Sequence, residues 1–287
     1  MKMSVELYTL SQKFGDDRAV ELVKEAGFDA IDYSYYWGNE KEEVLGDGYR
    51  EHALALRKKL DALGLVCNQA HAPFSFGYGA AFDVREPKYL WLVRSIESAA
   101  ILGAETIVVH ALSVPDEVDF EAYNIAYYRS LIPYCEKFGI HVAVENLFSY
   151  DGKRKRMVGK LGSPRELNHI VKEIASPFIV ACVDLGHASL TGYEPEDFVA
   201  KMDKSILRAL HVQDSNYLSD LHTLPYLGEL HWSAIMQALK KSGYTGDLTF
   251  EVFHYLEHFP APLIPHALKL TAATGRYLIS LYDACEA

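Results

Sequence analysis

The sequence predicts an α/β protein built as a single (β/α)₈ barrel domain that spans residues 1–287. A phrase recurs along the chain, in which a helical pattern is followed by Gly and then by a Val- and Ile-rich run. The first four of these glycines lie 37, 39 and 36 residues apart, and 287 residues divided by eight give about 36, close to one strand–helix unit. The runs are apolar at successive positions, as expected for parallel strands buried on both faces.

The positions of the elements follow from these runs. Strands are expected near residues 4–10, 30–35, 66–71, 106–111, 141–146, 179–184, 207–212 and 247–252, with helices between them and a long helix after residue 263. Five helices are expected to end in the left-handed conformation that Gly adopts without a clash, at Gly27, Gly64, Gly103, Gly139 and Gly243. A capping box of Ser163 and Glu166 begins the helix that runs to about residue 175. A doubly wound sheet is the alternative, although eight regular units are more than it usually needs.

The composition favours a protein that acts on small polar molecules. Its 28 Lys and Arg residues stand against 39 Asp and Glu residues, and the net charge of −11 disfavours broad binding to nucleic acid or to an anionic membrane. The four cysteines form no C-x-x-C pair, which is typical of a reducing compartment. We find no signal-peptide pattern and no apolar run of the roughly 18–20 residues that span a bilayer. We therefore expect a cytoplasmic protein without a membrane partner, and association into a homo-oligomer is left open.

Groups that can bind a divalent metal end six consecutive predicted strands. In chain order they are His71, His110, Glu145, Asp184 with His187, His211 and Glu251. The carboxyl ends of the strands face the active site in this kind of barrel. Asp220 and His222 follow in the next loop, two positions apart and therefore on one side of an extended segment. Each residue alone has a structural explanation, but carboxylates that are desolvated together repel one another unless a cation lies between them, so the set predicts a shared metal.

These residues resemble the xylose isomerase-like TIM-barrel superfamily, which includes sugar-phosphate isomerases and epimerases, ketose epimerases, inosose dehydratases and endonuclease IV. The resemblance covers essentially the whole chain and is carried by HAPF at 71–74, VVH at 108–110, VEN at 144–146, VDLGH at 183–187, HVQD at 211–214, the Asp220 and His222 pair, LGELHW at 227–232 and FEV at 250–252. It implies that the ligands of an epimerase-type metal are Glu145, Asp184, His211 and Glu251. Three carboxylates and one imidazole suit Mn²⁺ or Mg²⁺ and also accept Co²⁺ or Zn²⁺.

The resemblance also implies a reaction. Glu145 and Glu251 would be the catalytic acid/base pair, and His187 would hydrogen-bond a substrate oxygen. The expected enzyme is a divalent-metal-dependent isomerase or epimerase of a small sugar, sugar phosphate or related polyol, which abstracts and returns a proton through a metal-stabilised enediolate. A dehydratase on the same scaffold and a metal-bearing barrel without catalytic activity are alternatives.

The residues expected to contact the substrate are Trp37, Phe74, Asp151 and Tyr217. The aromatic faces of Trp37 and Phe74 follow strands two and three and could cover the C–H surface of a sugar, or simply pack a loop over the barrel mouth. Asp151 and Tyr217 stand where ketose epimerases have a longer acidic residue and an Arg that grips the substrate, which makes a free hexulose a weaker expectation. The basic run at 153–156, with Lys160, could bind a substrate phosphate if it folds over the mouth.

Endonuclease IV supplies a second set of correspondences. It binds three zinc ions through nine side chains, and this chain matches all nine in order. Beyond the four epimerase-type ligands, the additional metal ligands would be His71, His110, His187, Asp220 and His222. This implies the alternative of a three-zinc phosphodiesterase that acts on abasic DNA. The stretch ENLFSYDG is aromatic and bulky where the nucleases are Gly-rich and polar, and YSYYWGNEK has no Arg to enter a groove, so nucleic acid is the less favoured partner.

Overall fold

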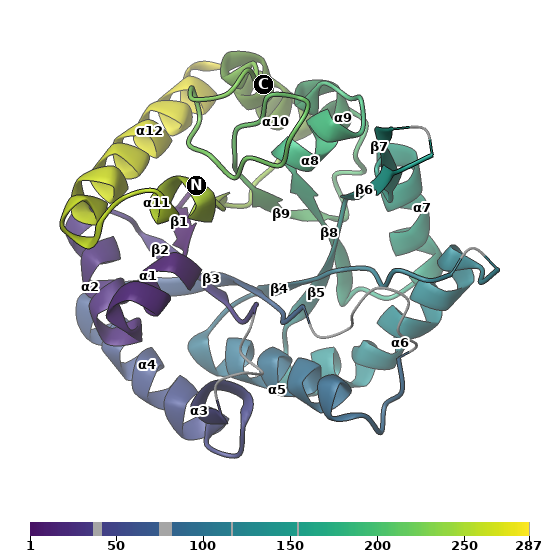
Figure 1. The fold of residues 1–287 in the computed structure, drawn as a ribbon, viewed down its shortest axis with the longest axis horizontal. Helices are drawn as coiled ribbons and strands as arrows, with labels where there is room; N and C mark the ends of the chain where they lie inside the picture. The colour runs from purple at the N-terminus through teal and green to yellow at the C-terminus, as the bar shows by residue number, and fades with distance from the viewer. Residues whose placement is uncertain (37–41, 75–81, 116, 154, 287) are drawn as a thin grey trace.

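The computed structural model describes residues 1–36, 42–74, 82–115, 117–153 and 155–286. The chain forms the predicted (β/α)₈ barrel, with parallel strands inside a ring of helices (Figure 1). The strands are β1 (Met3–Glu6), β2 (Ala30–Ser34), β3 (Val66–His71), β4 (Thr106–Val109), β5 (His141–Glu145), β8 (Ile179–Asp184), β9 (Leu207–His211) and β10 (Leu248–Phe250). They pair in the order β10, β1, β2, β3, β4, β5, β8, β9. The ring closes between β9 and β10, where the backbone N–H of Val212 donates to the carbonyl of Thr249 at 2.8 Å.

Helices surround the strands. They are α1 (Tyr8–Phe14), α2 (Asp16–Ala26), α3 (Glu42–Leu45), α4 (Tyr49–Leu63), α5 (Pro87–Leu102), α6 (Phe120–Phe138), α7 (Pro164–Ile174), α8 (Leu185–Leu190), α9 (Pro195–Ala200), α10 (Trp232–Ser242), α11 (Phe253–Glu257) and α12 (Ile264–Ala284), with a 3₁₀ turn at Ala261–Leu263. The short helices α8 and α11 also reach the end at which the strands finish. The five predicted glycines end α2, α4, α5, α6 and α10 with φ between 64° and 98°, as expected. The capping box of Ser163 and Glu166 is also confirmed. In the described part of the chain, none of the helices has the length and apolar character that crossing a membrane requires.

The interior of the barrel contains a small apolar cluster of its own. It is separate from the large core between strands and helices and consists of Val108, Ala143, Val180, Cys182 and Ala209. Side chains alternate between the two faces of a strand, so residues two positions further on share the inner face. Those residues are Glu145, Asp184 and His211 on β5, β8 and β9, and His110 directly after β4. Strand alternation therefore places the predicted site directly above the inner core.

The first strand is shorter than predicted. The expected strand at 4–10 is wrong beyond Glu6, because α1 begins at Tyr8. The backbone N–H of Tyr8 donates to the carboxylate of Glu6 at 2.7 Å, and the N–H of Ser11 already donates to the carbonyl of Leu7 at 2.8 Å. The turn depends on a buried side chain, which the apolar pattern of the sequence does not reveal. The other seven strands match the expected ranges within two residues at each end.

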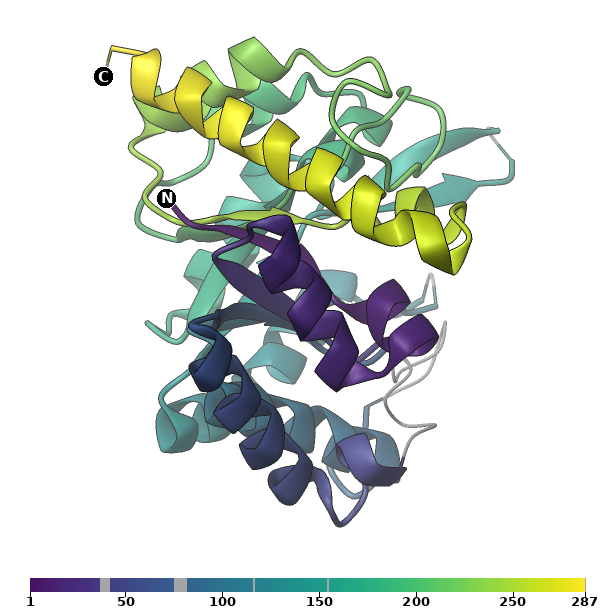
Figure 2. The ribbon, with the colours of Figure 1, turned by 90° about the vertical axis from the view of Figure 1, so that its left-hand side faces the viewer.

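A β-hairpin follows β5 where the sequence predicts only a loop. Its strands, β6 (Leu147–Asp151) and β7 (Arg156–Lys160), pair antiparallel. The hairpin projects from the end of the barrel that lies opposite both chain termini (Figure 2). This is the end at which the parallel strands finish, so the hairpin stands beside the predicted site.

Candidate metal and active site

A cavity of about 400 Å³ opens at the end of the barrel where the strands finish. The predicted metal ligands that line it are His110, Glu145, His187, Asp220, His222 and Glu251. The remaining three, His71, Asp184 and His211, are buried next to it, each no more than 1% exposed. The structure thus brings all nine predicted ligands, which come from six strands and one loop, to one place.

One group of ligands contains Glu145, Asp184, His211 and Glu251. Each offers one ligand atom, and these atoms all lie within 4.8 Å of one another. Nδ1 of His211 donates to Oε1 of Glu145 at 2.8 Å, and it lies 3.2 Å from Oε2 of Glu251 and 4.0 Å from Oδ2 of Asp184. Three carboxylates and an imidazole that converge in this way form a donor set that fits a divalent cation.

The charges in this group depend on one another. Burial opposes a positive charge on His211, yet Glu251 and Glu145 outweigh it and raise the pKa of the imidazole to about 10. Burial raises the pKa of Asp184 to about 6. Burial also opposes a negative charge on Glu145, but His211 and His110 outweigh it and hold the pKa of that carboxyl well below its usual value. The buried carboxylates therefore require positive charge among them.

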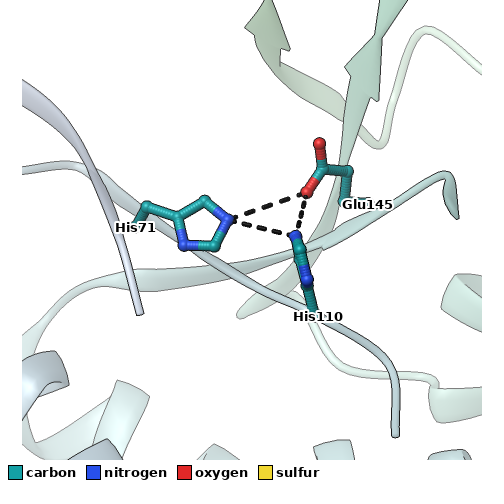
Figure 3. A group of neighbouring side chains, drawn as sticks. All are labelled: His71, His110 and Glu145. Atoms are coloured by element: carbon teal, nitrogen blue, oxygen red, sulfur yellow. Dashed lines mark hydrogen bonds and ion pairs between the residues drawn. The ribbon is translucent and has the colours of Figure 1, made fainter. Parts of the chain in front are cut away.

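A second group joins His71 and His110 to Glu145 (Figure 3). Nε2 of His110 lies 2.8 Å from Oε2 of Glu145 and 3.2 Å from Nε2 of His71. Nδ1 of His71 donates to the carbonyl of Ala72 at 2.8 Å, so the lone pair of its Nε2 is directed toward the other two side chains. This is the tautomer that a metal-binding histidine needs.

A third group contains His187, Asp220 and His222. Both histidines donate from Nδ1 to backbone carbonyls, His187 to that of Asn146 at 3.0 Å and His222 to that of Glu251 at 3.2 Å. Their Nε2 atoms face Oδ2 of Asp220 at 3.6 and 3.0 Å. Burial opposes a charge on Asp220, but the two imidazoles outweigh it and hold the pKa of that carboxyl far below its usual value. With both Nδ1 atoms paired to carbonyls, the two Nε2 atoms and the carboxylate of Asp220 face one another as the ligands of one metal would.

Our sequence reasoning missed the polar residues that complete this layer from the first three strands. Glu6, Asp32 and Gln69 are paired across β1, β2 and β3, and all three are buried. Burial raises the pKa of Glu6 to about 8 and that of Asp32 to about 7. Strand alternation could have found both carboxylates, since it places Ser4 with Glu6 and Ala30 with Asp32 on one face of each strand.

Two further side chains hold the ligands in place. The phenol of Tyr36 donates to Oε1 of Glu251. Nε2 of Gln213 donates to Oδ2 of Asp184 at 3.1 Å and to Oδ1 of Asp220 at 3.0 Å, so it links the first and third groups. The sequence does not reveal such residues, because Tyr and Gln are not typical ligands of these metals and do not stand at the positions where ligands are expected.

Aromatic side chains line the cavity, among them Phe74, which was expected there, and Phe148. Phe74 lines the cavity and stacks on Tyr36, with ring centroids 4.7 Å apart. Phe148 lines it from β6 and meets the ring of His187 at 5.0 Å. Trp37 lies outside the described residues.

Asp151 and Tyr217, the two polar residues expected to contact the substrate, lie away from the cavity wall. Neither Asp151 nor Tyr217 is among the described residues that line the cavity. Asp151 accepts a hydrogen bond from the backbone N–H of Lys153 within the hairpin, at 2.9 Å. The phenol of Tyr217 donates to Oε2 of Glu194 at 2.6 Å. In the described part of the chain, neither residue therefore forms part of the cavity wall.

The basic run at 153–156 does not line the cavity in the part that the structure describes. Lys153 and Lys155 are exposed at the hairpin tip, and Arg154 lies outside the described residues. Lys160 lines a different cavity, of about 630 Å³, together with Arg165 on α7. The described basic side chains of the hairpin thus do not line the cavity that holds the metal ligands.

Comparisons with known proteins agree with this architecture. The family model described as "Xylose isomerase-like TIM barrel" matches residues 20–274. An uncharacterised protein of Methanocaldococcus jannaschii is 29% identical over 191 residues, a match that covers 63% of this chain and 62% of that protein. A D-tagatose 3-epimerase-like protein has a similar structure, with a TM-score of 0.76, 23% identity and coverage of 99% of this chain and 98% of that one. A D-psicose 3-epimerase, crystallised in the presence of D-fructose, gives a TM-score of 0.71 at 17% identity, with 97% and 99% coverage.

Proposed function

Because the chain belongs to the xylose isomerase-like TIM-barrel family, we propose that it is a divalent-metal-dependent isomerase or epimerase of a small sugar. The placement of the first ligand group carries this proposal. Of its four members, only Glu145 and Glu251 line the cavity, while Asp184 and His211 are buried beside it. A substrate in the cavity would therefore touch two carboxylates that also reach the metal position. The sugar 3-epimerases that share the fold support this class of reaction.

The four residues of the first group would hold the metal. When bound there, a divalent ion polarises a substrate carbonyl and stabilises the negative charge that develops on its oxygen. Three carboxylates and one imidazole favour Mn²⁺ or Mg²⁺, whereas the histidines of the other two groups shift the preference towards Zn²⁺ or Co²⁺.

Glu145 and Glu251 would act as base and acid on the substrate. One carboxylate takes the proton from a carbon next to the carbonyl, and the electron pair of that C–H bond forms a C=C bond while the carbonyl oxygen gains the charge. If the other carboxylate returns a proton to the opposite face of the same carbon, the reaction is an epimerisation. If the proton goes to the former carbonyl carbon, and the hydroxyl proton moves from the oxygen of the first carbon to that of the second, it is an isomerisation. His187, on the cavity wall, would hydrogen-bond a substrate oxygen.

An uncharged sugar fits this wall better than a sugar phosphate. The described residues that line the cavity include no Lys and no Arg. Its apolar side is formed by residues such as Phe74, Phe148 and Phe253, which suit the C–H faces of a sugar ring or chain. We therefore place unphosphorylated ketoses and aldoses first among the substrates to test.

Deuterium exchange tests the proposal. The protein, loaded with Mn²⁺ or Zn²⁺, is incubated in D₂O with a panel of free and phosphorylated sugars, and exchange of the proton next to the carbonyl is followed by NMR. We expect exchange on at least one uncharged sugar. Glu251→Gln should slow it by a factor of about 10² to 10⁴, the usual contribution of a general base. Glu25→Gln, a change of an exposed surface residue, is the matched control. Metal-loaded wild-type protein that exchanges none of the sugars would contradict the proposal.

Phosphodiester hydrolysis is the second candidate, and one observation favours it. The first two ligand groups share Glu145, and Gln213 links the third group to the first, so the three groups are adjacent as a metal cluster requires. Against it stand the net charge of −11 and the lack of Lys and Arg among the described residues of the cavity wall. About three zinc ions per chain, with chelator-sensitive cleavage of an abasic duplex, would favour the nuclease. One metal per chain, with no cleavage, would favour the isomerase.

A further inference from the structure

Asp32 lies beside the proposed metal site without belonging to any of the three ligand groups. The residue is 1% exposed, and on β2 it pairs with Glu6 of β1 and Gln69 of β3. Nε2 of Gln69 donates to Oδ2 of Asp32 at 3.0 Å, while Oδ1 has no hydrogen-bond partner among the described residues. A buried polar atom without a partner costs about 1–3 kcal/mol, so this oxygen needs an explanation.

His211 also carries a buried atom without a partner, and it faces the other oxygen of Asp32, the one that accepts from Gln69. Its Nδ1 faces the ligand carboxylates, 2.8 Å from Oε1 of Glu145. Its Nε2 is buried and has no hydrogen-bond partner in the described part of the chain. Oδ2 of Asp32 lies 3.9 Å from that Nε2. A hydrogen bond between an N–H group and a carboxylate spans about 2.7–3.2 Å, so a shift of roughly 1 Å closes the contact.

The orientation of His211 differs from that of three other ligand histidines. His71, His187 and His222 donate Nδ1–H to backbone carbonyls, which leaves Nε2 for a metal. His211 presents Nδ1 to its ligand group instead, so its proton must stay on Nε2 when Nδ1 gives its lone pair to a metal. The group that faces Nε2 of His211 is the carboxylate of Asp32, whereas the protonated nitrogens of the other three rings face backbone carbonyls.

We infer that Asp32 is the positioning residue of the metal site, because its carboxylate accepts the Nε2–H of His211, fixes the orientation of the ring and makes Nδ1 a stronger ligand. The inference rests on the proposed function, since it requires a metal at His211.

Glu6 offers a comparison within the same layer. It is fully buried and its Oε1 also has no hydrogen-bond partner in the described chain, but its Oε2 accepts the N–H of Tyr8 at the start of α1.

Metal affinity tests the inference without reference to activity. Asp32→Asn and Glu6→Gln each remove one buried carboxylate from this layer with almost no change in size. Zn²⁺ binding to the full chain is measured by competition with a chromophoric chelator, and circular dichroism checks the fold. We expect Asp32→Asn to weaken Zn²⁺ binding about 10- to 100-fold, the usual effect of losing such a partner, and Glu6→Gln to change it much less. Wild-type affinity in Asp32→Asn, or equal losses in both variants, would overturn the inference.

Nitrogen-15 NMR of the histidine rings gives a readout that does not depend on any variant folding. In the Zn²⁺-loaded wild-type protein we expect His211 to be protonated at Nε2, with a hydrogen-bonded proton that exchanges slowly with water. A His211 protonated at Nδ1, or an Nε2–H that exchanges as freely as an exposed one, would contradict the role of Asp32. If the wild-type protein binds neither Zn²⁺ nor Mn²⁺, the inference and the proposed function fail together. If it binds Zn²⁺ with an affinity that Asp32→Asn leaves unchanged, only the inference fails.

Discussion

Glu145 belongs to two ligand groups because its two carboxylate oxygens face different partners. Oε1 accepts a hydrogen bond from His211, and Oε2 lies 2.8 Å from Nε2 of His110. A glutamate that transfers protons needs one oxygen open to the substrate, whereas a glutamate that bridges two metals uses both. The side chains that face Oε2 therefore decide between the two candidate functions.

Replacement of His110 separates these roles. If the protein is an isomerase or epimerase with its metal in the first group, His110→Ala should keep that metal and leave sugar exchange within about tenfold of wild type, because Oε2 of Glu145 becomes more open. His211→Ala removes a ligand of the first group and should lose both metal and exchange. Metal content and deuterium exchange, measured on the same samples, give the answer. Loss of exchange in His110→Ala with the metal retained would show that the second group is required for the chemistry.

At the scale of elements, the β6–β7 hairpin forms part of the cavity wall. Leu147 and Phe148 line the cavity from β6. The base of the hairpin is held by a close approach of two glycines, since a Cβ on Gly162 would overlap the Cα of Gly159 and come within 2.8 Å of Cγ2 of Thr191. The position of Phe148 over the site thus depends on the lack of a side chain at Gly162.

Gly162→Ala should displace the hairpin and leave the metal ligands in place. We expect a rise of several-fold in KM for the sugar that shows exchange, because the wall moves, with an unchanged metal affinity. Gly152→Ala is the matched control, because a Cβ at this exposed position meets nothing within 4 Å. Steady-state kinetics and chelator competition provide the two readouts. A KM that stays at the wild-type value in Gly162→Ala would mean that the hairpin does not contact the substrate.

The sequence predicts those elements whose signal is local. Seven strands follow from continuous apolar runs, and most of the metal ligands follow because they stand at the ends of such runs, as His110 and Glu145 do. The hairpin is not predicted, since ENLFSYDG has no apolar run and its pairing with residues 156–160 depends on the barrel beside it. Asp32 and Gln69 are missed for a related reason. They lie within strands, and the contacts that join Gln69 to Asp32 and bring Asp32 to within 3.9 Å of His211 form only between strands that are distant in the sequence.

At the scale of the whole molecule, the barrel collects negative charge at the end where its strands finish. The carboxyl groups gathered there include Asp32, Glu145, Asp184, Asp220 and Glu251, in a chain with a net charge of −11. Their mutual repulsion opposes folding, and a cation bound among them relieves it only in the native state. Metal binding should therefore stabilise the whole fold.

Thermal unfolding measures this linkage. A metal at one hundred times its Kd should add about 2.7 kcal/mol to the free energy of unfolding and raise Tm by several degrees, and a chelator should reverse the change. In Asp184→Asn the amide oxygen can still cap α8 through the N–H of His187, but one ligand charge is gone. We expect a much smaller rise in Tm for this variant. A rise as large as that of wild type would place the metal elsewhere in the molecule.

The position of the metal tests the central claim most directly. Crystals grown with Mn²⁺ and measured at an X-ray energy where manganese scatters anomalously should show one strong peak bonded to Glu145, Asp184, His211 and Glu251. A peak that these four side chains do not surround, or a map without any peak in protein that has been shown to bind Mn²⁺ in solution, would contradict the assignment of the site.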